Sequence, residues 1–245
     1  MGYFSTVCVM LFLVLFFLAG FVVSGVAFLV GLLSQDKKDR INTAYVRFGF
    51  RVILFLSNCP VEVVGMENIP EKEAALFIGN HRGMFDVVAL GSLPLPLIGF
   101  VAKAELEKVP FLNGWMRRIH CLFLDRKDIR QGMQMILSAI DLLKEGRSLC
   151  IFPEGTRNTT ADPLLPFHAG SFKIALKAGA PIVPFVINGT EGTLEDHFPR
   201  IDGHRIRIEF GTPVPTAGAD RTRQKEIPEE VRTWIEEKYL AQKEA

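Results

Sequence analysis

The stretch "LFIGNHRGMFD", residues 76–86, marks the passage from a buried strand to a helix, and the rest of the predicted fold is built around it. Its first four residues are short and apolar, as in a strand buried inside a sheet. A helix is expected to begin near Phe85. Between the two, His81 and Asp86 would point about 140° away from each other on one regular helix. Their side chains can therefore meet only if the chain turns, and Gly83 would allow that turn.

Short apolar runs of the same kind recur along the chain after Pro60, each bounded by polar residues, glycine or proline. We expect them to be buried strands. They are "AALFIG" at 74–79, "LIGFVAK" at 97–103, "CLFLD" at 121–125, "SLCIF" at 148–152 and "PIVPFVI" at 181–187. "RIRIEFG", at 205–211, alternates polar and apolar residues, which predicts a half-exposed edge strand.

Helical patterns separate these runs. From Ile129 to Leu143 apolar residues recur at helical spacing, and Gly146 is a suitable C-cap. A closing helix is expected from Pro228, which is followed by acidic residues. Strands alternating with helices predict an α/β fold with a single sheet, helices packed on it and several parallel strand pairs. The order of the strands does not follow from these patterns.

The N-terminal part is different, because no charged residue occurs from Val7 to Leu33. These are about 27 residues, or roughly 40 Å of helix against roughly 30 Å of bilayer hydrocarbon, enough to span with tilt or to dip in and return. A signal peptide would need a basic segment before a shorter apolar run, and no Lys or Arg precedes Lys37. We therefore expect a retained membrane anchor. The basic residues Lys37, Lys38 and Arg40 predict that the following chain lies on the cytoplasmic side.

The next segment, residues 41–57, is amphipathic. Arg47 and Arg51 lie one helical turn apart. Apolar residues run along another side of this helix: Tyr45, Phe48, Val52 and Phe55. The helix either lies at the lipid headgroups with its arginines toward phosphates, or packs on the domain with two solvated arginines. We predict an anchor with an interfacial helix over residues 1–58 and a sheet-centred domain over residues 59–245.

Composition and missing motifs exclude several classes of function. The net charge of +1 gives no bulk attraction to nucleic acid. The absence of G-x-S-x-G, G-x-x-x-x-G-K-[ST] and G-x-G-x-x-G removes the usual support for a serine nucleophile or a bound nucleotide. The 4 cysteines lack metal-ligand spacing and the 5 histidines include no H-E-x-x-H pair. We therefore expect reduced thiols, no metal ion and no bound cofactor.

The first candidate site is the pair of His81 and Asp86, in a strand-to-helix turn at one end of the sheet, where α/β folds place their ligands. Asp86 would lie in the first helical turn, where the helix dipole favours a carboxylate. If it accepts a hydrogen bond from His81, the other imidazole nitrogen is free to act as a base. The alternative is a capping aspartate and a hydrogen-bonded surface histidine without a catalytic role.

A second candidate is "FPEGTR", residues 152–157, which follows another buried strand. Gly155 lets the backbone approach a ligand, and the planar guanidinium of Arg157 suits a phosphate. Glu154 would orient that arginine or hold the loop; the alternative is a plain bridge between Glu154 and Arg157. "FLDR" also ends a strand with a cation, Arg126, so Arg126 and Arg157 are able to converge on one anion.

Together, "NHRGMFD", "FVAKAELEKVPFLNGWMRRIHCLFLDR", "FPEGTR" and "APIVPFVING" resemble the four ordered blocks of the glycerolipid acyltransferase family, particularly bacterial 1-acyl-glycerol-3-phosphate acyltransferases. The resemblance covers about residues 60–215. It implies that His81 is the general base and Asp86 its orienting partner. It also implies an acceptor site formed by Lys103, Arg126, Glu154, Gly155, Thr156 and Arg157, and a mainly structural last block around Pro184.

The resemblance implies a membrane enzyme of phospholipid biosynthesis that makes phosphatidic acid. An acyl thioester of coenzyme A or acyl carrier protein would acylate the sn-2 hydroxyl of 1-acyl-sn-glycerol 3-phosphate. Another acceptor, such as glycerol 3-phosphate, and a non-catalytic lipid-binding protein are the alternatives. The chain departs from the family pattern at Arg82, Gly83 and Phe85, and at His168 and Ala169, which bears on the acceptor rather than on the proposed base.

Overall fold

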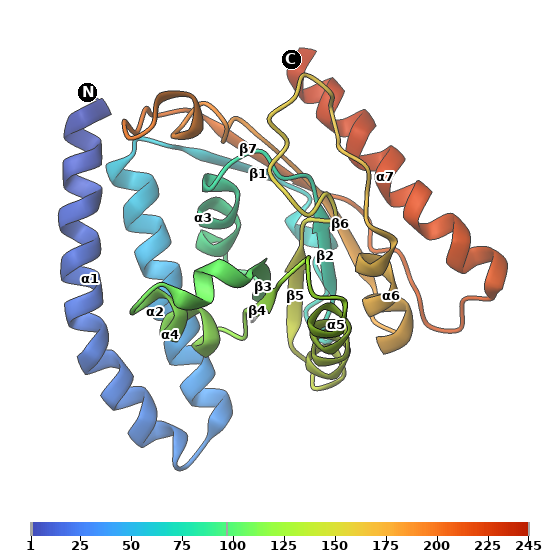
Figure 1. Cartoon of the computed structure of the whole chain (residues 1–245), viewed down its shortest axis with the longest axis horizontal. Helices are drawn as coiled ribbons and strands as arrows, with labels where there is room; N and C mark the ends of the chain where they lie inside the picture. Colours follow the sequence, from blue (N-terminus) through green and yellow to red (C-terminus); the bar gives the residue numbers. More distant parts are fainter. Residues whose placement is uncertain (1, 97, 245) are drawn as a thin grey trace.

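The computed structural model describes residues 2–96 and 98–244. Its centre is a seven-stranded sheet in the order β1-β7-β6-β2-β5-β3-β4 (Figure 1). The strands are β1 (Val61–Val64), β2 (Leu76–Gly79), β3 (Ile98–Lys103), β4 (Leu122–Leu124), β5 (Ser148–Ile151), β6 (Ile182–Asn188) and β7 (Ile206–Phe210). Every apolar run identified in the sequence contains a strand, so the α/β fold class is confirmed. Strand β1 is an addition to the predicted set.

The strands from β6 to β4 are parallel, whereas β7 is antiparallel to β6 and parallel to β1. The prediction of an edge strand at 205–211 is therefore wrong, because β7 lies between β1 and β6. Its alternation has another cause. Ile206, Ile208 and Phe210 enter the core, while Arg207 and Glu209 lie on the other face and pair with Glu62 and Lys238.

Helices cover both faces of the sheet (Figure 1). The helices are α1 (Gly2–Gly31), α2 (Gln35–Leu56), α3 (Phe85–Ser92), α4 (Leu112–Arg118), α5 (Ile129–Lys144), α6 (Ala169–Ala178) and α7 (Arg221–Glu244). One buried cluster joins the sheet to α1, α2, α3 and α4. A second cluster joins the opposite face to α5, α6 and α7. The central strands β2 and β5 are buried at every position because both of their faces are covered.

The helix boundaries show where local signals succeed. Helix α5 matches its prediction, and Gly146 follows it with a φ of +82°, the left-handed conformation typical of a helix end. Helix α7 differs from its prediction, because it begins at Arg221, before Pro228, and the proline lies in its interior. The cap is Asp220, whose Oδ1 accepts the N–H of Arg223 at 2.8 Å. The proline therefore did not mark the helix start, contrary to our expectation.

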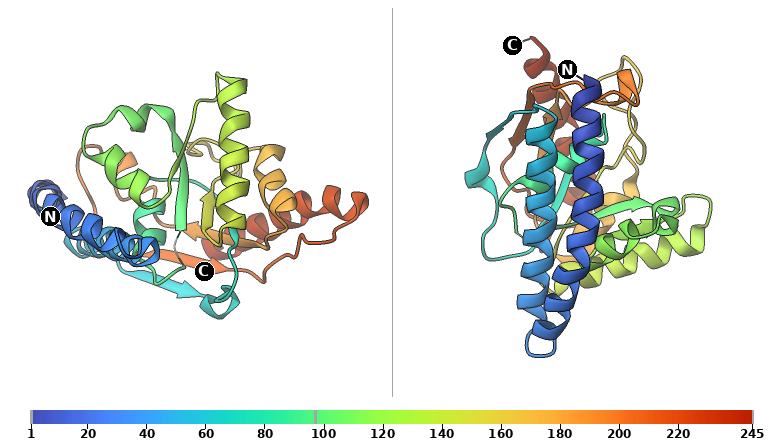
Figure 2. Two further views of the ribbon diagram at one scale, coloured as in Figure 1. Left: turned by 90° about the horizontal axis from the view of Figure 1, so that it is seen from below. Right: turned by 90° about the vertical axis from the view of Figure 1, so that its left-hand side faces the viewer.

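Helices α1 and α2 form an antiparallel hairpin that lies along the domain (Figure 2). Helix α1 is long and apolar enough to cross a membrane, and only 11% of its most apolar window is buried. Tyr45 of α2 stacks on Phe16 of α1 with ring centroids 4.3 Å apart, and Trp115 of α4 lies against Tyr45. Gly49 permits this contact, because a Cβ there would lie 2.6 Å from the Phe16 ring.

Helix α2 packs on the domain and Arg51 is exposed, as in the second predicted alternative, but both arginines also donate to backbone carbonyls. Arg47 Nη2 donates to the carbonyl of Leu95 at 2.7 Å, and Arg51 Nε donates to the carbonyl of Ser92 at 2.9 Å. Both carbonyls lie at or just beyond the C-terminal end of α3, which attracts cations. Arg47 and Arg51 therefore hold α2 to the sheet domain and do not face lipid phosphate or solvent alone.

Candidate active site

The predicted site lies where the adjacent central strands β2 and β5 end. Helix α3, which follows β2, packs on one face of the sheet, and α6, which comes after β5 and its loop, packs on the opposite face. In α/β proteins, ligands bind at the carboxyl ends of two neighbouring parallel strands whose following helices go to opposite faces of the sheet. The turn at 80–86 and the loop at 152–157 are therefore neighbours in space.

His81 and Asp86 meet as the sequence predicts. His81 Nδ1 lies 2.6 Å from Asp86 Oδ2, and because a carboxylate only accepts hydrogen bonds, Nδ1 carries the proton. The imidazole stacks on Phe152, with ring centroids 4.2 Å apart, and the side chain is 18% exposed. No hydrogen bond to Nε2 occurs among the described residues. The pair thus leaves the second ring nitrogen, Nε2, unprotonated and able to accept a proton.

Asp86 is completely buried and held by further donors. Its Oδ2 accepts the backbone N–H groups of Arg82 at 2.7 Å and of Gly83 at 2.9 Å. Its Oδ1 accepts the hydroxyl of Thr190 at 2.5 Å. Asp86 therefore caps the turn and orients His81 at the same time, which unites the two alternatives raised by the sequence.

Glu154 holds the loop and has no free oxygen for a substrate. Its Oε1 accepts the N–H of His81 and its Oε2 accepts the N–H of Leu165, both at 2.8 Å. The side chain is only 4% exposed, and this burial raises the pKa of the carboxyl, an effect that the two N–H donors partly offset. Of the two roles that the sequence offered Glu154, holding the loop is the one that the geometry supports.

Arg157 does not bridge to Glu154. Its Nη1 donates to Glu195 Oε1 at 2.7 Å, and 40% of its side chain is exposed. The alternative of a plain bridge between Glu154 and Arg157 is therefore wrong, and Arg157 pairs with Glu195, which follows β6. The exposed part of the guanidinium is available to a ligand.

The remaining predicted residues occupy the same edge of the sheet. Gly155 has a left-handed φ of +68°, and a Cβ there would lie 3.6 Å from Arg126 Cζ, so Arg126 reaches the loop at 152–157. Lys103 ends β3 and is exposed, and Thr156 is half-buried beside Gly155. The structure thus brings Arg126 to Gly155 and places Lys103 farther along the same edge, beside β4.

The sequence profile described as Acyltransferase matches residues 60–188, which is more than half of the chain and contains every site residue predicted from the sequence. This chain belongs to the acyltransferase family. A relative from Mycoplasma pneumoniae, named probable 1-acyl-sn-glycerol-3-phosphate acyltransferase, is 30% identical over 200 residues, 77% of this chain and 74% of the relative. A Borreliella burgdorferi protein named 1-acyl-sn-glycerol-3-phosphate acyltransferase is 34% identical over 152 residues, 62% of this chain and 60% of its own length.

The fold of this acyltransferase is also that of a solved relative. The crystal structure of the 1-acyl-sn-glycerophosphate acyltransferase PlsC from Thermotoga maritima superimposes with a TM-score of 0.81 at 24% identity, over 96% of this chain and 95% of that one. The similarity extends over the hairpin as well as the sheet, so the arrangement of α1 and α2 against the domain belongs to a known architecture.

Three residues of the acyltransferase site were not predicted from the sequence. Thr190 and Glu195 follow β6, and Asn80 exchanges two hydrogen bonds of 2.8 Å with the backbone of Ile187 in β6. A signal existed for Thr190, because the polar segment after "PIVPFVI" ends a predicted parallel strand. Without the strand order, however, nothing places that segment beside the strand that carries His81.

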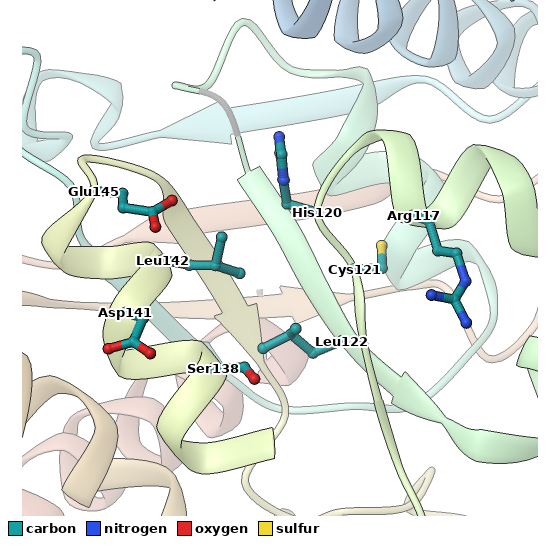
Figure 3. Close-up of a pocket in the computed structure, with 8 residues that line it drawn as sticks. All are labelled: Arg117, His120, Cys121, Leu122, Ser138, Asp141, Leu142 and Glu145. Atoms are coloured by element: carbon teal, nitrogen blue, oxygen red, sulfur yellow. The ribbon is translucent and has the colours of Figure 1, made fainter. Parts of the chain in front are cut away.

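A separate pocket of about 360 Å³ lies at the other end of the sheet (Figure 3). It is lined by Arg117, His120, Cys121, Leu122, Ser138, Asp141, Leu142 and Glu145. They come from the end of α4, the start of β4 and the last turns of α5 just before β5, so the pocket lies near the amino ends of β4 and β5, whereas His81 follows the carboxyl end of β2. The pocket is therefore distinct from the acyltransferase site. Among the described residues no group of His, Cys, Asp or Glu could hold a metal ion, and the expected absence of a metal stays a prediction.

Proposed function

We propose that this acyltransferase moves a fatty acyl group from an acyl thioester to the sn-2 hydroxyl of 1-acyl-sn-glycerol 3-phosphate, giving phosphatidic acid. The observation that carries the proposal is the His81–Asp86 pair beside the exposed guanidinium of Arg157, a base and an anion site at one edge of the sheet. The names of the relatives from Mycoplasma and Borreliella support the acceptor.

In this mechanism His81 activates the acceptor. Its Nε2 takes the proton of the sn-2 hydroxyl as the oxygen attacks the thioester carbonyl carbon. The tetrahedral intermediate then collapses, the C–S bond breaks, and the leaving sulfur takes the proton from Nε2, which restores the neutral imidazole. Asp86 stabilises the transient imidazolium and keeps Nδ1 protonated throughout.

The acceptor's phosphate is assigned to the cations at the sheet edge. The guanidinium of Arg157 can meet two phosphate oxygens at once, and Arg126 and Lys103 add positive charge from neighbouring strand ends. Such a clamp holds the hydroxyl near Nε2, which accelerates transfer by positioning. Coenzyme A and acyl carrier protein are both possible carriers of the thioester.

We further propose that the hairpin anchors the enzyme in one leaflet on the cytoplasmic side, without crossing the bilayer. Near the start of α1, the hydroxyl of Thr6 donates to the carbonyl of Pro199 at 3.2 Å and accepts the N–H of Ile201 at 3.0 Å. Beyond the middle of α1, the ring of Phe21 packs against that of Phe111, with ring centroids 5.9 Å apart. A helix flanked by the domain at both places cannot span the hydrocarbon alone. Unpaired thiols, with Cys59, Cys121 and Cys150 buried, fit the reducing cytoplasm.

The test is a product assay with the purified full chain and a radiolabelled acyl thioester. Turnover on 1-acyl-sn-glycerol 3-phosphate is compared with turnover on glycerol 3-phosphate and on a phosphate-free lysolipid. The first acceptor should be preferred, and Arg157→Lys should raise its KM at least about tenfold, which corresponds to about 1.4 kcal/mol. Preference for the phosphate-free lysolipid would overturn the proposed acceptor, and no product from any of the three would overturn transferase activity.

A further inference from the structure

The turn between His81 and Asp86 is held by three carboxylates, one of which lies outside all the sequence blocks. Glu154 accepts the N–H of His81, and Asp86 accepts those of Arg82 and Gly83. The next N–H, that of Met84, donates to Glu195 Oε1 at 2.7 Å. These four successive N–H groups are therefore occupied, and none is free to stabilise an oxyanion.

Glu195 has a second partner that links the turn to the proposed phosphate site. The same Oε1 accepts Nη1 of Arg157 at 2.7 Å, and 15% of the Glu195 side chain is exposed. Its Oε2 is buried and has no hydrogen-bond partner among the described residues. One carboxylate oxygen thus fixes both the turn that carries the base and the arginine that would meet the acceptor.

Gly83 makes room for this carboxylate. Its φ is not in the left-handed region, so the turn does not need glycine for its backbone conformation. The reason is space: a Cβ at residue 83 would lie 3.1 Å from Glu195 Oε2 and 3.0 Å from the carbonyl oxygen of Thr190. Both distances are tighter than ordinary side-chain contacts. The departure from the family pattern at residue 83 is thereby connected to Glu195.

We propose that Glu195 is a positioning residue of the transfer reaction, with Gly83 as the residue that admits it. The proposal rests on the proposed function, because it takes Arg157 to bind the acceptor's phosphate. With Nη1 held by Glu195, the rest of the exposed guanidinium is presented to the ligand in one orientation. Without Glu195 the arginine would sample several rotamers, and ordering it again would weaken acceptor binding.

The experiment compares the wild type with Glu195→Ala, Glu195→Gln and the control Asp196→Asn, an exposed neighbour in the same short helix. KM for phosphorylated acceptor and thioester, kcat and the melting temperature are measured. Glu195→Ala should raise the acceptor KM at least about tenfold and leave the thioester KM within about twofold. Glu195→Gln keeps an acceptor oxygen for both donors and should recover most of this loss. Asp196→Asn should match the wild type.

Three results would overturn the proposal. They are an unchanged acceptor KM in Glu195→Ala, an equal rise in both KM values with a lowered melting temperature, and a lower acceptor KM. The last would show that Glu195 competes with phosphate for Arg157. Wild-type turnover is the separate measure of the proposed function, so its failure is not confused with these outcomes.

The assigned role of Gly83 has its own test. Gly83→Ala should raise the acceptor KM by itself, but add little in the Glu195→Ala background, because one of its two close contacts is then gone. Fully additive effects of the two substitutions would separate Gly83 from Glu195 and overturn that part of the proposal.

Discussion

At the residue scale, the chemistry of the site depends on which oxygen of Asp86 meets which donor. Oδ2 accepts hydrogen bonds from His81 Nδ1 and two backbone N–H groups, whereas Oδ1 accepts one from the hydroxyl of Thr190 and from no other group in the described part of the chain. A hydroxyl can rotate to accept as well as donate. An amide at residue 86 would therefore fit, with its oxygen in place of Oδ2 and its NH₂ toward Thr190.

We predict that Asp86→Asn keeps the fold and loses turnover. The amide preserves the contacts but removes the charge that stabilises the imidazolium, so kcat should fall by about 10²–10⁴-fold with little change in melting temperature. His81→Ala should abolish measurable transfer. Thr190→Ser, which keeps the hydroxyl, is the matched control. Wild-type turnover in well-folded His81→Ala would remove His81 as the base.

The buried thiols predict a pH dependence of stability. Burial raises the pKa of Cys121 from 9.0 to about 12. Above pH 9 the unfolded chain loses this proton while the folded protein retains it, so stability falls as the pH rises through this window. The slope for one thiol is at most about 1.4 kcal/mol per pH unit.

Urea unfolding near pH 9.5 and 10.5 measures that slope. Cys121→Ala should reduce the slope of unfolding free energy against pH by the contribution of one thiol. Cys8→Ala, at a half-buried position on α1, should leave this slope nearly unchanged. An unaltered slope in Cys121→Ala would contradict the assignment to Cys121.

At the scale of elements, the sequence predicts what depends on local pattern and misses what depends on strand order. Strands β2 to β7 and helix α5 follow from apolar runs and helical spacing, and the turn at 80–86 follows from the broken periodicity, whereas β1 was not predicted. The pairing of Arg157 with Glu195 does not, because β6 and β5 flank β2 only in three dimensions. The edge-strand prediction for β7 failed for the same reason, because the strand order does not follow from the sequence patterns.

The role of Arg82 also becomes visible only from packing. Its side chain is 6% exposed. Its guanidinium donates to the carbonyls of Thr160 at 2.8 Å and Asp162 at 2.6 Å, and lies 4.9 Å from the ring centre of Tyr239 in α7. Arg82, one of the positions at which the chain departs from the family pattern, therefore joins the turn at 80–86, the loop after Arg157 and the last helix.

We predict that Arg82→Gln lowers the free energy of unfolding by about 2 kcal/mol, since it removes charge-assisted hydrogen bonds to buried carbonyls. The melting temperature should drop by about 4–8 °C for a chain of this size. Lys127→Gln, at an exposed position with no ion pair among the described residues, is the control. Equal melting temperatures for the two variants would contradict this account.

At the scale of the whole molecule, the hairpin is both a packed part of the fold and its most apolar surface. Leu54 belongs to the core of the sheet domain, and buried Asp39 pairs with Arg147 next to β5. The predicted boundary near residue 58 stays a prediction. Removing residues 1–58 would expose core, so it cannot separate membrane binding from folding.

Substitutions on the outer side of α1 can separate them, because Leu11, Leu18 and Val22 are 61%, 59% and 71% exposed. We predict that changing all three to Gln releases the enzyme from phospholipid vesicles while its melting temperature stays the same. Three inserted apolar side chains contribute roughly 5 kcal/mol to binding, so vesicle partitioning should fall at least about a hundredfold. Turnover on a short-chain soluble acceptor should persist. The matched control changes three exposed apolar residues of α5, Ile129, Met133 and Leu137, to Gln. If the α5 variant leaves the vesicles and the α1 variant does not, the membrane contacts the opposite face of the sheet, and the hairpin is a structural element only.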